Sequence, residues 1–143
     1  LIYYNKRLGE EDGAPMKKLL VIALFLILFV ISSCANQPIG DPADSALEYL
    51  SALAEKDKAT LANLSCKSWE EQAMLESDAL LSVGAALNNV SCKVSGQDGD
   101  FQLVNCTGKL DLTYGEEVRS IDLSLRTYYM ANEDGQWRVC SYK

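Results

Sequence analysis

The spacing of apolar residues changes once along the chain, near Asn88, and that change restricts the folds the chain can adopt. Before Asn88, apolar residues recur about every 3.6 residues, as they do on the buried face of a helix. After it they alternate with polar residues, which is typical of a strand with one buried face. The pattern therefore predicts an α+β domain in which the helices come first and the strands follow.

Three helices are expected in the first part. The first starts at Pro42 with Asp41 as its N-cap, because these residue types are favoured at the start of a helix. The second is expected over residues 58–66. The third covers residues 69–87, with Ser68 as its candidate N-cap. No strand is expected to interrupt them.

Four strands are expected after the helices, at residues 90–94, 101–114, 118–131 and 136–142. Turn-forming residues separate them at positions 97–100, 115–116 and 132–135. On the third strand one row is expected to be buried: Ile121, Leu123, Leu125, Thr127 and Tyr129. The other row, which ends in Arg126, is expected to face water. Together the elements predict three N-terminal helices packed on an antiparallel four-stranded meander.

The composition excludes several classes of function. Residues 34–143 carry 17 Asp and Glu against 9 Lys and Arg, a net charge of −8. Nucleic-acid partners need clustered positive charge, so none is expected. The sequence has no His, which is the most common metal ligand and the usual general base near neutral pH. No metal, cofactor or catalytic residue is therefore assigned, and an enzyme is the less favoured interpretation.

Four cysteines in the folded part of the chain indicate two disulfides. They are Cys66, Cys92, Cys106 and Cys140, and their spacings of 26, 14 and 34 residues do not match the close pairs of a zinc site. If the first hairpin is centred on Gly99, Cys92 faces Cys106 across it. Cys66 then pairs with Cys140, and this bridge closes a long loop worth about 4 to 5 kcal/mol.

One observation resists this pairing. Cys140 alternates out of phase with Trp137 and Val139, so a bulge or a twist is needed to bring it to the helices. The alternative pairs therefore stay open: Cys66 with Cys92, and Cys106 with Cys140.

A separate signal precedes the folded part, from Met16 to Cys34. It has two lysines, then thirteen apolar residues, then Ser32, Ser33 and Cys34. A basic start, a short apolar core and small residues at the end are the parts of a secretory signal peptide. A membrane-spanning helix would need about 20 apolar residues. Residues 16–33 are therefore expected to be a signal peptide.

The last four residues of this segment, Ile31 to Cys34, resemble a bacterial lipobox. The resemblance implies that Cys34 carries a diacylglyceryl thioether and further acyl chains such as palmitate, which explains the one cysteine left without a partner. Residues 34–41 would be the lipidated tether. Residues 42–143 would be a domain outside the cytoplasm, anchored to the cell membrane or the outer membrane. Residues 1–15 fit no part of this scheme and are expected to be a leader that is not translated.

Two segments of the domain, residues 46–57 (ALEYLSALAEKD) and 134–139 (DGQWRV), carry a further resemblance. They are similar to the opening helix and the last hairpin of the nuclear-transport-factor-two-like and ketosteroid isomerase superfamily. Among its members the chain looks most like small uncharacterised bacterial lipoproteins. The resemblance implies a curved, cone-like sheet around the helices, with one strand fewer than the common form of the family.

The resemblance also implies a ligand pocket at the mouth of the cone. Its lining residues would be aromatic: Tyr49, Trp69, Tyr114, Tyr129 and Trp137. Without a pocket, the same side chains would simply fill the core. A catalytic base would have to be an inward carboxylate, but alternation turns Asp111 and Asp122 outward. No catalytic residue is therefore carried over from the family.

Three functions stay open at this point. The first is an envelope lipoprotein without enzymatic activity that binds a small apolar ligand or a partner protein. The second is a lipid-tethered enzyme of the isomerase or dehydratase kind that uses a carboxylate in the cone. The third is a structural or interaction module with a filled cone. An open cavity without inward carboxylates favours the first function. A dry apolar cavity with one or more inward carboxylates favours the second, and a packed interior favours the third.

Overall fold

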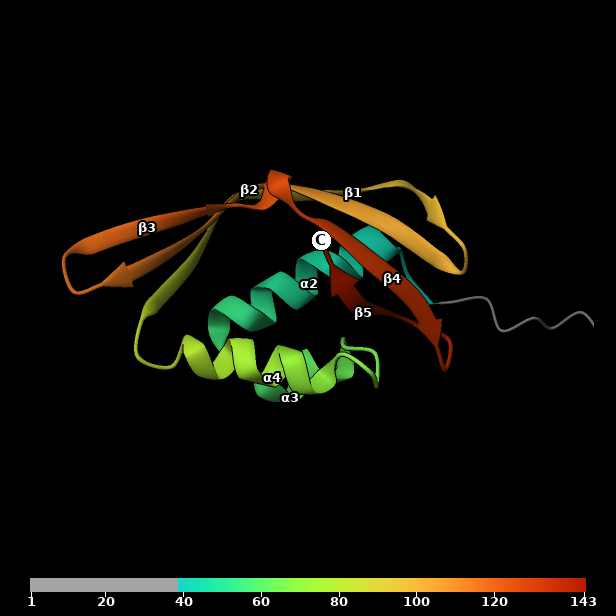
Figure 1. Cartoon of the computed structure of the whole chain (residues 1–143), viewed down its shortest axis with the longest axis horizontal. Helices are drawn as coiled ribbons and strands as arrows, with labels where there is room; N and C mark the ends of the chain where they lie inside the picture. The colour runs from blue at the N-terminus through green and yellow to red at the C-terminus, as the bar shows by residue number, and fades with distance from the viewer. Residues whose placement is uncertain (1–38) are drawn as a thin grey trace, which may run out of the picture. The chain divides into compact units, whose positions relative to one another are not determined.

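The computed structural model describes residues 39–143 and is shown in Figure 1. Its helices are α2 (Pro42–Glu55), α3 (Lys58–Asn63) and α4 (Glu70–Ala79). Its strands are β1 (Gly84–Asp98), β2 (Phe101–Tyr114), β3 (Glu117–Asp122), β4 (Thr127–Glu133) and β5 (Gln136–Tyr142), with a 3-10 turn, η1 (Leu123–Leu125), after β3. The signal peptide, the lipobox and Cys34 lie outside the described residues. Among residues 39–143, no helix is both long enough and apolar enough to cross a membrane.

The domain is α+β, and its antiparallel sheet has five strands where four were expected. β2 lies at the centre. β1 pairs with one edge of β2 along almost its whole length, while β3 and β4 pair one after the other with the opposite edge. β5 pairs with the free edge of β4. In Figure 1 the sheet arches over α2, and α3 and α4 lie below that helix.

The additional strand arises because η1 breaks the expected third strand, residues 118–131. Asp122 holds this turn, since its carboxylate accepts a hydrogen bond from the backbone N–H of Ser124 (2.9 Å). The chain before the turn pairs with the second half of β2, and the chain after it pairs with the first half. The single strand predicted over residues 118–131 is therefore two strands, β3 and β4.

The turn also shifts the alternation of buried and exposed residues by one position. Leu125 is 80% exposed, whereas Tyr128 and Met130 are fully buried. The expectation that Leu125, Thr127 and Tyr129 share the buried face was therefore wrong. A 3-10 turn advances the chain with a period of three, so the period of two cannot continue through it.

The third helix is shorter than expected, because it ends at Ala79 and β1 begins at Gly84. β1 has 15 residues and therefore extends well beyond the predicted strand 90–94. Val83 and Leu87 were assigned to the helix on their spacing. Residues four apart share a face both in a helix and in a strand, so that spacing does not distinguish the two.

The ends of α3 and α4 also differ from the prediction. α3 stops before the expected end at Cys66, because the chain there joins β5. The backbone N–H of Cys66 donates to the Val139 carbonyl, and the backbone N–H of Val139 donates to the Leu64 carbonyl, both at 2.8 Å. At the start of α4, the N-cap position is taken by Trp69 and not by Ser68, and its side chain makes no capping hydrogen bond.

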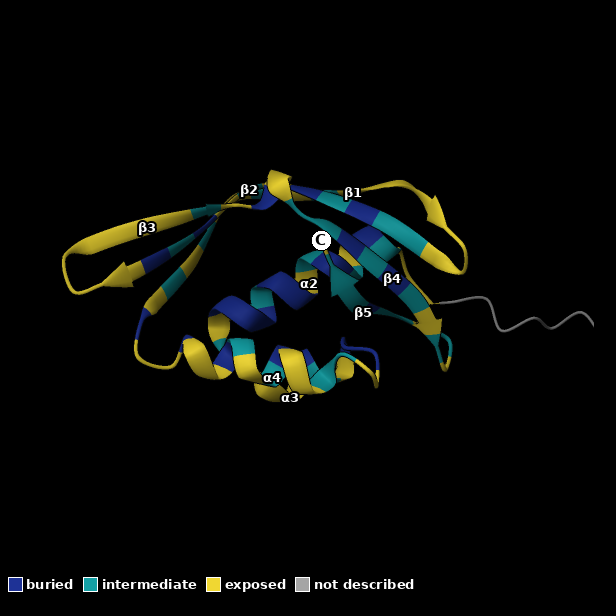
Figure 2. Ribbon diagram, viewed as in Figure 1, coloured by how far each residue is buried: buried dark blue, intermediate teal, exposed yellow. Residues whose placement is uncertain are grey.

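α2 begins as predicted. The Asp41 carboxylate accepts a hydrogen bond from the backbone N–H of Ala43 (2.8 Å), and Pro42 takes the first helical position. The buried face of the helix, dark blue in Figure 2, includes four residues that are at most 4% exposed: Ala46, Tyr49, Leu50 and Leu53. α2 is therefore the centre of the hydrophobic core.

The register of the first hairpin is confirmed. Cys92 lies opposite Cys106 and Val94 lies opposite Val104. The two cysteines form a disulfide, with their Cα atoms 4.0 Å apart. This bridge ties the two strands of the hairpin together in the register that the apolar rows require.

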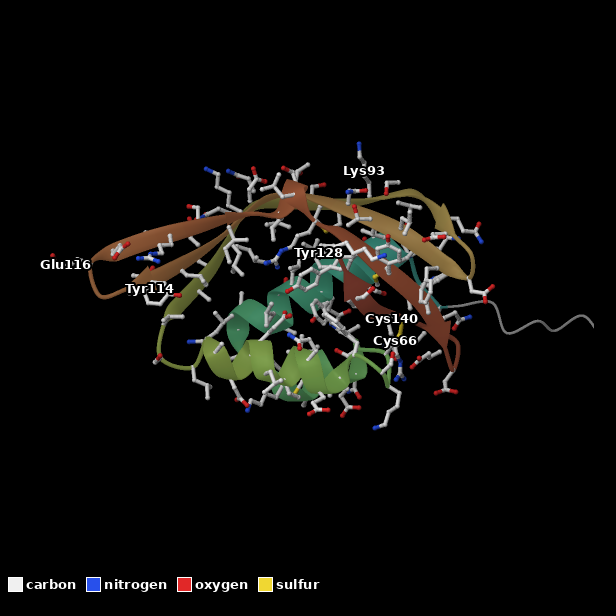
Figure 3. All side chains as sticks on the ribbon, viewed as in Figure 1. Cys66, Lys93, Tyr114, Glu116, Tyr128 and Cys140 are labelled. Carbon is white, nitrogen blue, oxygen red and sulfur yellow. A yellow bond between two sulfur atoms is a disulfide. The ribbon has the colours of Figure 1, made fainter. Side chains whose placement is uncertain are left out.

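The second disulfide joins Cys66, which follows the second helix, to Cys140 in β5 (Figure 3). Their Cα atoms are 4.8 Å apart. β5 has a bulge at Cys140, because its pairing with β4 passes from Ser141 directly to Val139. Because of this bulge, the side chains of two successive residues, Val139 and Cys140, can both lie toward the helices. The bulge therefore explains why Cys140 is out of phase with the alternation in the sequence.

Another bulge divides the sheet into two parts. It lies at Asn89 in β1 (φ 52°), opposite Gly108 in β2 (φ 94°). A Cβ atom on Gly108 would lie 2.5 Å from the backbone carbonyl oxygen of Asn89, so the position requires glycine. We call residues 84–88 and 109–122 the wing, and the rest of the described chain the body. In Figure 1 β3 and the part of β2 that pairs with it extend to the left.

Candidate functional site

A small cleft lies where the wing joins the body, with a volume of about 170 Å³. Its walls combine an apolar set, Leu53, Ala79, Leu80, Leu110 and Ile121, with a polar set, Glu76, Arg126 and Tyr142. These residues come from α2, from α4 and its C-cap, from β2, β3 and β5, and from the C-cap of η1. Segments that are distant in sequence thus meet at one site.

Tyr142 connects the polar side chains of the cleft. Its hydroxyl donates a hydrogen bond to Glu76 Oε1 (2.8 Å). The guanidinium carbon of Arg126 lies 4.4 Å from the centre of its ring, in a cation–π contact. Its ring also contacts Trp69, edge to face at 5.6 Å, and Tyr128 at 5.7 Å. The carboxylate and the guanidinium are therefore held at different parts of one aromatic ring.

The phenols around the cleft stay protonated far above neutral pH. Burial raises the pKa of Tyr142 to about 12, and the hydrogen bond to Glu76 acts in the same direction. Burial also raises the pKa of Tyr49, whose hydroxyl accepts a hydrogen bond from the indole N–H of Trp69 (3.1 Å). The hydroxyl groups are therefore available as hydrogen-bond donors under physiological conditions.

Tyr128 is fully buried, as Tyr49 is, and Figure 3 labels it beneath the arch of the sheet. Its hydroxyl has no hydrogen-bond partner among the described residues. Burial raises the pKa of Tyr128; the positive charge of Arg126 opposes the rise and the negative charge of Glu76 adds to it. Both charges of the cleft therefore act on this hydroxyl, and a buried donor without a partner calls for a structural explanation.

The five aromatic residues expected to line a pocket do not line this cleft. Tyr49 and Trp69 are hydrogen-bonded to each other, and Trp69 contacts Tyr142 from outside the cleft lining. Tyr114 lies on the wing, as Figure 3 shows, and its side chain is exposed. Tyr129 packs against Phe101 at 6.0 Å. The fifth, Trp137, is partly buried against the core.

Glu76, Arg126 and Tyr142 were not expected at a site. Arg126 was expected to face water, but η1 changes the phase of the chain just before it, and the side chain lines the cleft instead. The sequence does contain a signal for this change. Asp122 with Ser124 two residues later is a turn motif, because a carboxylate can accept from the backbone N–H two positions on.

The two carboxylates expected to point outward lie away from the cleft. Asp111 accepts hydrogen bonds from Asn88 and, at 2.5 Å, from Ser120, all on the exposed side of the wing. Asp122 accepts from Ser124 in η1. Glu76 is therefore the carboxylate that lines the cleft.

One group of residues near the second disulfide has side chains of the types that bind metals. Among the described residues, Cys66, Glu133 and Cys140 place three potential ligand atoms within 4.8 Å of one another. Both sulfurs are already joined in the disulfide. The group thus offers one carboxylate, which is too few ligands for a structural metal site.

Comparison with known proteins yields likenesses at the level of structure. No family model and no curated protein matches the chain. A SEC-C motif containing protein from Rhodopseudomonas palustris matches with a TM-score of 0.42 and 11% identity, over 65% of this chain and 70% of that one. The helical cell shape determining protein from Campylobacter jejuni matches with a TM-score of 0.47 and 6% identity, over 69% of this chain and 38% of that one. Both TM-scores lie below 0.5, and function is therefore argued from the chain's own residues.

Proposed function

We propose that the chain is a bacterial envelope lipoprotein, held at the membrane by acyl chains on Cys34, and that its domain binds a small, mainly apolar ligand without chemical conversion. The cleft at the junction of wing and body is the binding site. The observation that carries the proposal is the composition of this cleft, five apolar wall residues with three polar groups at one side. Ligand sites typically combine apolar walls with a few oriented polar groups.

The size of the cleft limits the ligand. Its volume of about 170 Å³ is close to that of cavities of about 150 Å³ that take up benzene. The remaining interior is occupied by fully buried side chains, among them Tyr49, Tyr128, Met130 and Val139. The ligand is therefore compact, and a large lipid or a sterol does not fit without rearrangement of the core.

The arrangement supports binding over catalysis. Glu76, the carboxylate that an enzyme of the isomerase kind would use, accepts hydrogen bonds at Oε1 from Tyr142 and from Gln72 (3.3 Å). These two donors hold the carboxylate in place at the wall of the cleft, as expected of a polar group that orients a ligand. The packed interior would also suit an interaction module, the remaining alternative. An interaction module would need a surface that binds a partner protein. The cleft, with its apolar walls and oriented polar groups, is a more specific indication of a small ligand.

The proposed relationship to the nuclear-transport-factor-two-like superfamily agrees with the helices-first order and the arched sheet. In such an arrangement a ligand enters between the helices and the concave face of the sheet. The cleft of this chain lies at that place, between α2, α4 and the sheet.

The cleft is tested by blocking it. Fluorobenzene added to the full chain in detergent micelles is expected to bind, as seen in its fluorine NMR spectrum, and Ala79→Trp is expected to abolish binding by filling the cleft. Ala59→Trp is the matched control, because Ala59 is an exposed helical alanine outside the cleft lining. Equal binding by both variants, or no binding to the parent protein, would contradict the proposal.

The anchor is tested separately. Cells that express the chain are fed a palmitate analogue, and the protein is expected to become labelled. Cys34→Ala is expected to remove the label and release the protein from the membrane fraction. Equal labelling of the two proteins would refute lipidation at Cys34.

A further inference from the structure

The cleft contains two opposite charges that are not paired with each other. Glu76 and Arg126 both line it, yet neither forms an ion pair with any described residue. Tyr142 accounts for their separation, since its hydroxyl holds the carboxylate and its ring face holds the guanidinium. Both side chains are only partly buried at the wall of the cleft, so each can pair with a ligand group of opposite charge.

A ligand with a single charge cannot satisfy both groups. A carboxylate placed against Arg126 would also lie close to Glu76, and an ammonium placed against Glu76 would lie close to Arg126. Since the cleft is small, each of these ligands would bring one favourable and one unfavourable charge contact. A ligand with both charges at one end satisfies both partners.

The remaining walls define the rest of the ligand. Leu53, Leu80, Leu110 and Ile121 are aliphatic, and together with Ala79 they offer a surface for a short branched hydrocarbon group. A volume of about 170 Å³ admits a body of roughly benzene size. The walls therefore favour a short aliphatic group over a polar ring.

We propose that the ligand of this cleft is an aliphatic α-amino acid of the leucine type, with its carboxylate on Arg126, its ammonium group on Glu76, and its side chain against the aliphatic wall. This inference rests on the proposed binding function and names its ligand class. The zwitterion head provides both charges on adjacent atoms, and the branched side chain provides the apolar body.

Three probes of nearly equal size separate the contributions of the two charges. L-leucine carries both, 4-methylpentanoate lacks the ammonium group, and 3-methylbutylamine lacks the carboxylate. Equilibrium dialysis against the full chain in detergent micelles is expected to show L-leucine bound at least about tenfold more tightly than either analogue, because a site built around a polar group rejects a ligand that lacks it.

Two conservative variants then give a crossed pattern that loss of folding cannot produce. Arg126→Gln is expected to weaken L-leucine about tenfold while 3-methylbutylamine binds at least as well as before. Glu76→Gln is expected to weaken L-leucine by a similar factor while 4-methylpentanoate binds better, and glutamine still accepts the hydrogen bond from Tyr142.

The outcomes separate this inference from the function on which it rests. If either singly charged analogue binds as tightly as L-leucine, or if L-leucine fails to bind while fluorobenzene still occupies the cleft, the amino-acid assignment is overturned and the binding function stands. If neither L-leucine nor fluorobenzene binds, both are overturned.

Discussion

The two halves of β2 have the same alternating pattern of apolar residues but different surroundings. In the body, residues 101–107 lie between β1 and β4 and over α2, and the inward residues Val104 and Cys106 are fully buried. In the wing, residues 109–114 lie between β1 and β3, and β3 is mostly exposed. In Figure 2 β3 is mostly yellow, whereas β4 is mostly teal and dark blue.

The contrast teaches that an alternating apolar pattern identifies the residues that share one face of a strand. It does not identify the element that covers that face. Val118 of the wing is 57% exposed, although it is as apolar as Val104. The helices reach only part of the sheet, so the burial of a strand residue depends on elements far away in sequence. The energetic importance of a residue should therefore follow its position relative to α2 and not its hydrophobicity.

The bridge between helices and β5 is expected to be the strongest single constraint on the body. Replacing both Cys66 and Cys140 by serine is expected to lower the free energy of unfolding by about 4 to 5 kcal/mol, because the bridge spans 74 residues. Urea unfolding followed by circular dichroism under non-reducing conditions measures the loss.

The double serine variant of Cys92 and Cys106 is the control for that measurement. Its bridge spans 14 residues within one hairpin, so the expected loss is about 3 kcal/mol. A larger loss for the hairpin pair than for the pair that joins helices to sheet would contradict the comparison. Peptide mapping without reduction should show the same two pairs.

The boundary between wing and body is expected to depend on Gly108. Gly108→Ala should lower the free energy of unfolding by about 3 kcal/mol, since the new Cβ meets the Asn89 carbonyl oxygen and the backbone φ is positive. Gly99→Ala is the control, because Gly99 also has a positive φ but open space around it. Gly99→Ala should lower the free energy of unfolding by about 1 kcal/mol. Equal losses for the two variants, measured by thermal unfolding, would rule out a steric clash at Gly108.

A pair of valines on the sheet tests the contrast directly. Val104→Ala is expected to cost about 2 kcal/mol, because it removes two buried methyl groups and leaves a cavity. Val118→Ala, at a site that is 57% exposed, is expected to cost less than about 0.5 kcal/mol. Similar losses of unfolding free energy for the two variants, measured by urea unfolding, would mean that the side chain of Val118 is buried in solution.

The smallest expected effect is a pH dependence from Tyr142. Its folded pKa is raised to about 12 from an ordinary value of 10.0, so folding favours the neutral phenol. This stabilisation is complete below pH 10 and is lost as the pH rises through about 12. Because the side chain is partly exposed, the contribution is about 1 kcal/mol after allowance for solvent screening.

The measurement compares the parent protein with Tyr142→Phe. The free energy of unfolding of the parent should fall more steeply above pH 10 than that of the variant, which has no phenol at this position. Parallel curves for the two proteins would show that the burial of Tyr142 has no energetic consequence.

Local features of the fold were predictable from the sequence where local chemistry decides them. The start of α2 follows from Asp41 and Pro42, and the bounds of the second and last predicted strands, 101–114 and 136–142, coincide with β2 and β5. The register of the first hairpin followed from its turn and its apolar rows. In each case the deciding contacts lie within a few residues of one another in the chain.

Features that depend on distant contacts were missed. β3 and β4 appear as one strand in the sequence, because a three-residue turn leaves the composition unchanged and alters only the phase. The shift in alternation decides whether Arg126 faces water or the cleft. The candidate site could therefore not be predicted from the sequence without knowledge of the turn. The end of α4 was missed for a related reason, since a spacing of four residues suits both a helix and a strand.

The two disulfides differ in the structure that must form before each can close. Cys92 and Cys106 belong to one hairpin, so the pairing of its two strands is enough to bring them together. Cys140 meets Cys66 where backbone hydrogen bonds join β5 to the chain that follows α3. The bridge between Cys66 and Cys140 therefore reports that helices and sheet have docked, whereas the bridge between Cys92 and Cys106 reports the hairpin alone.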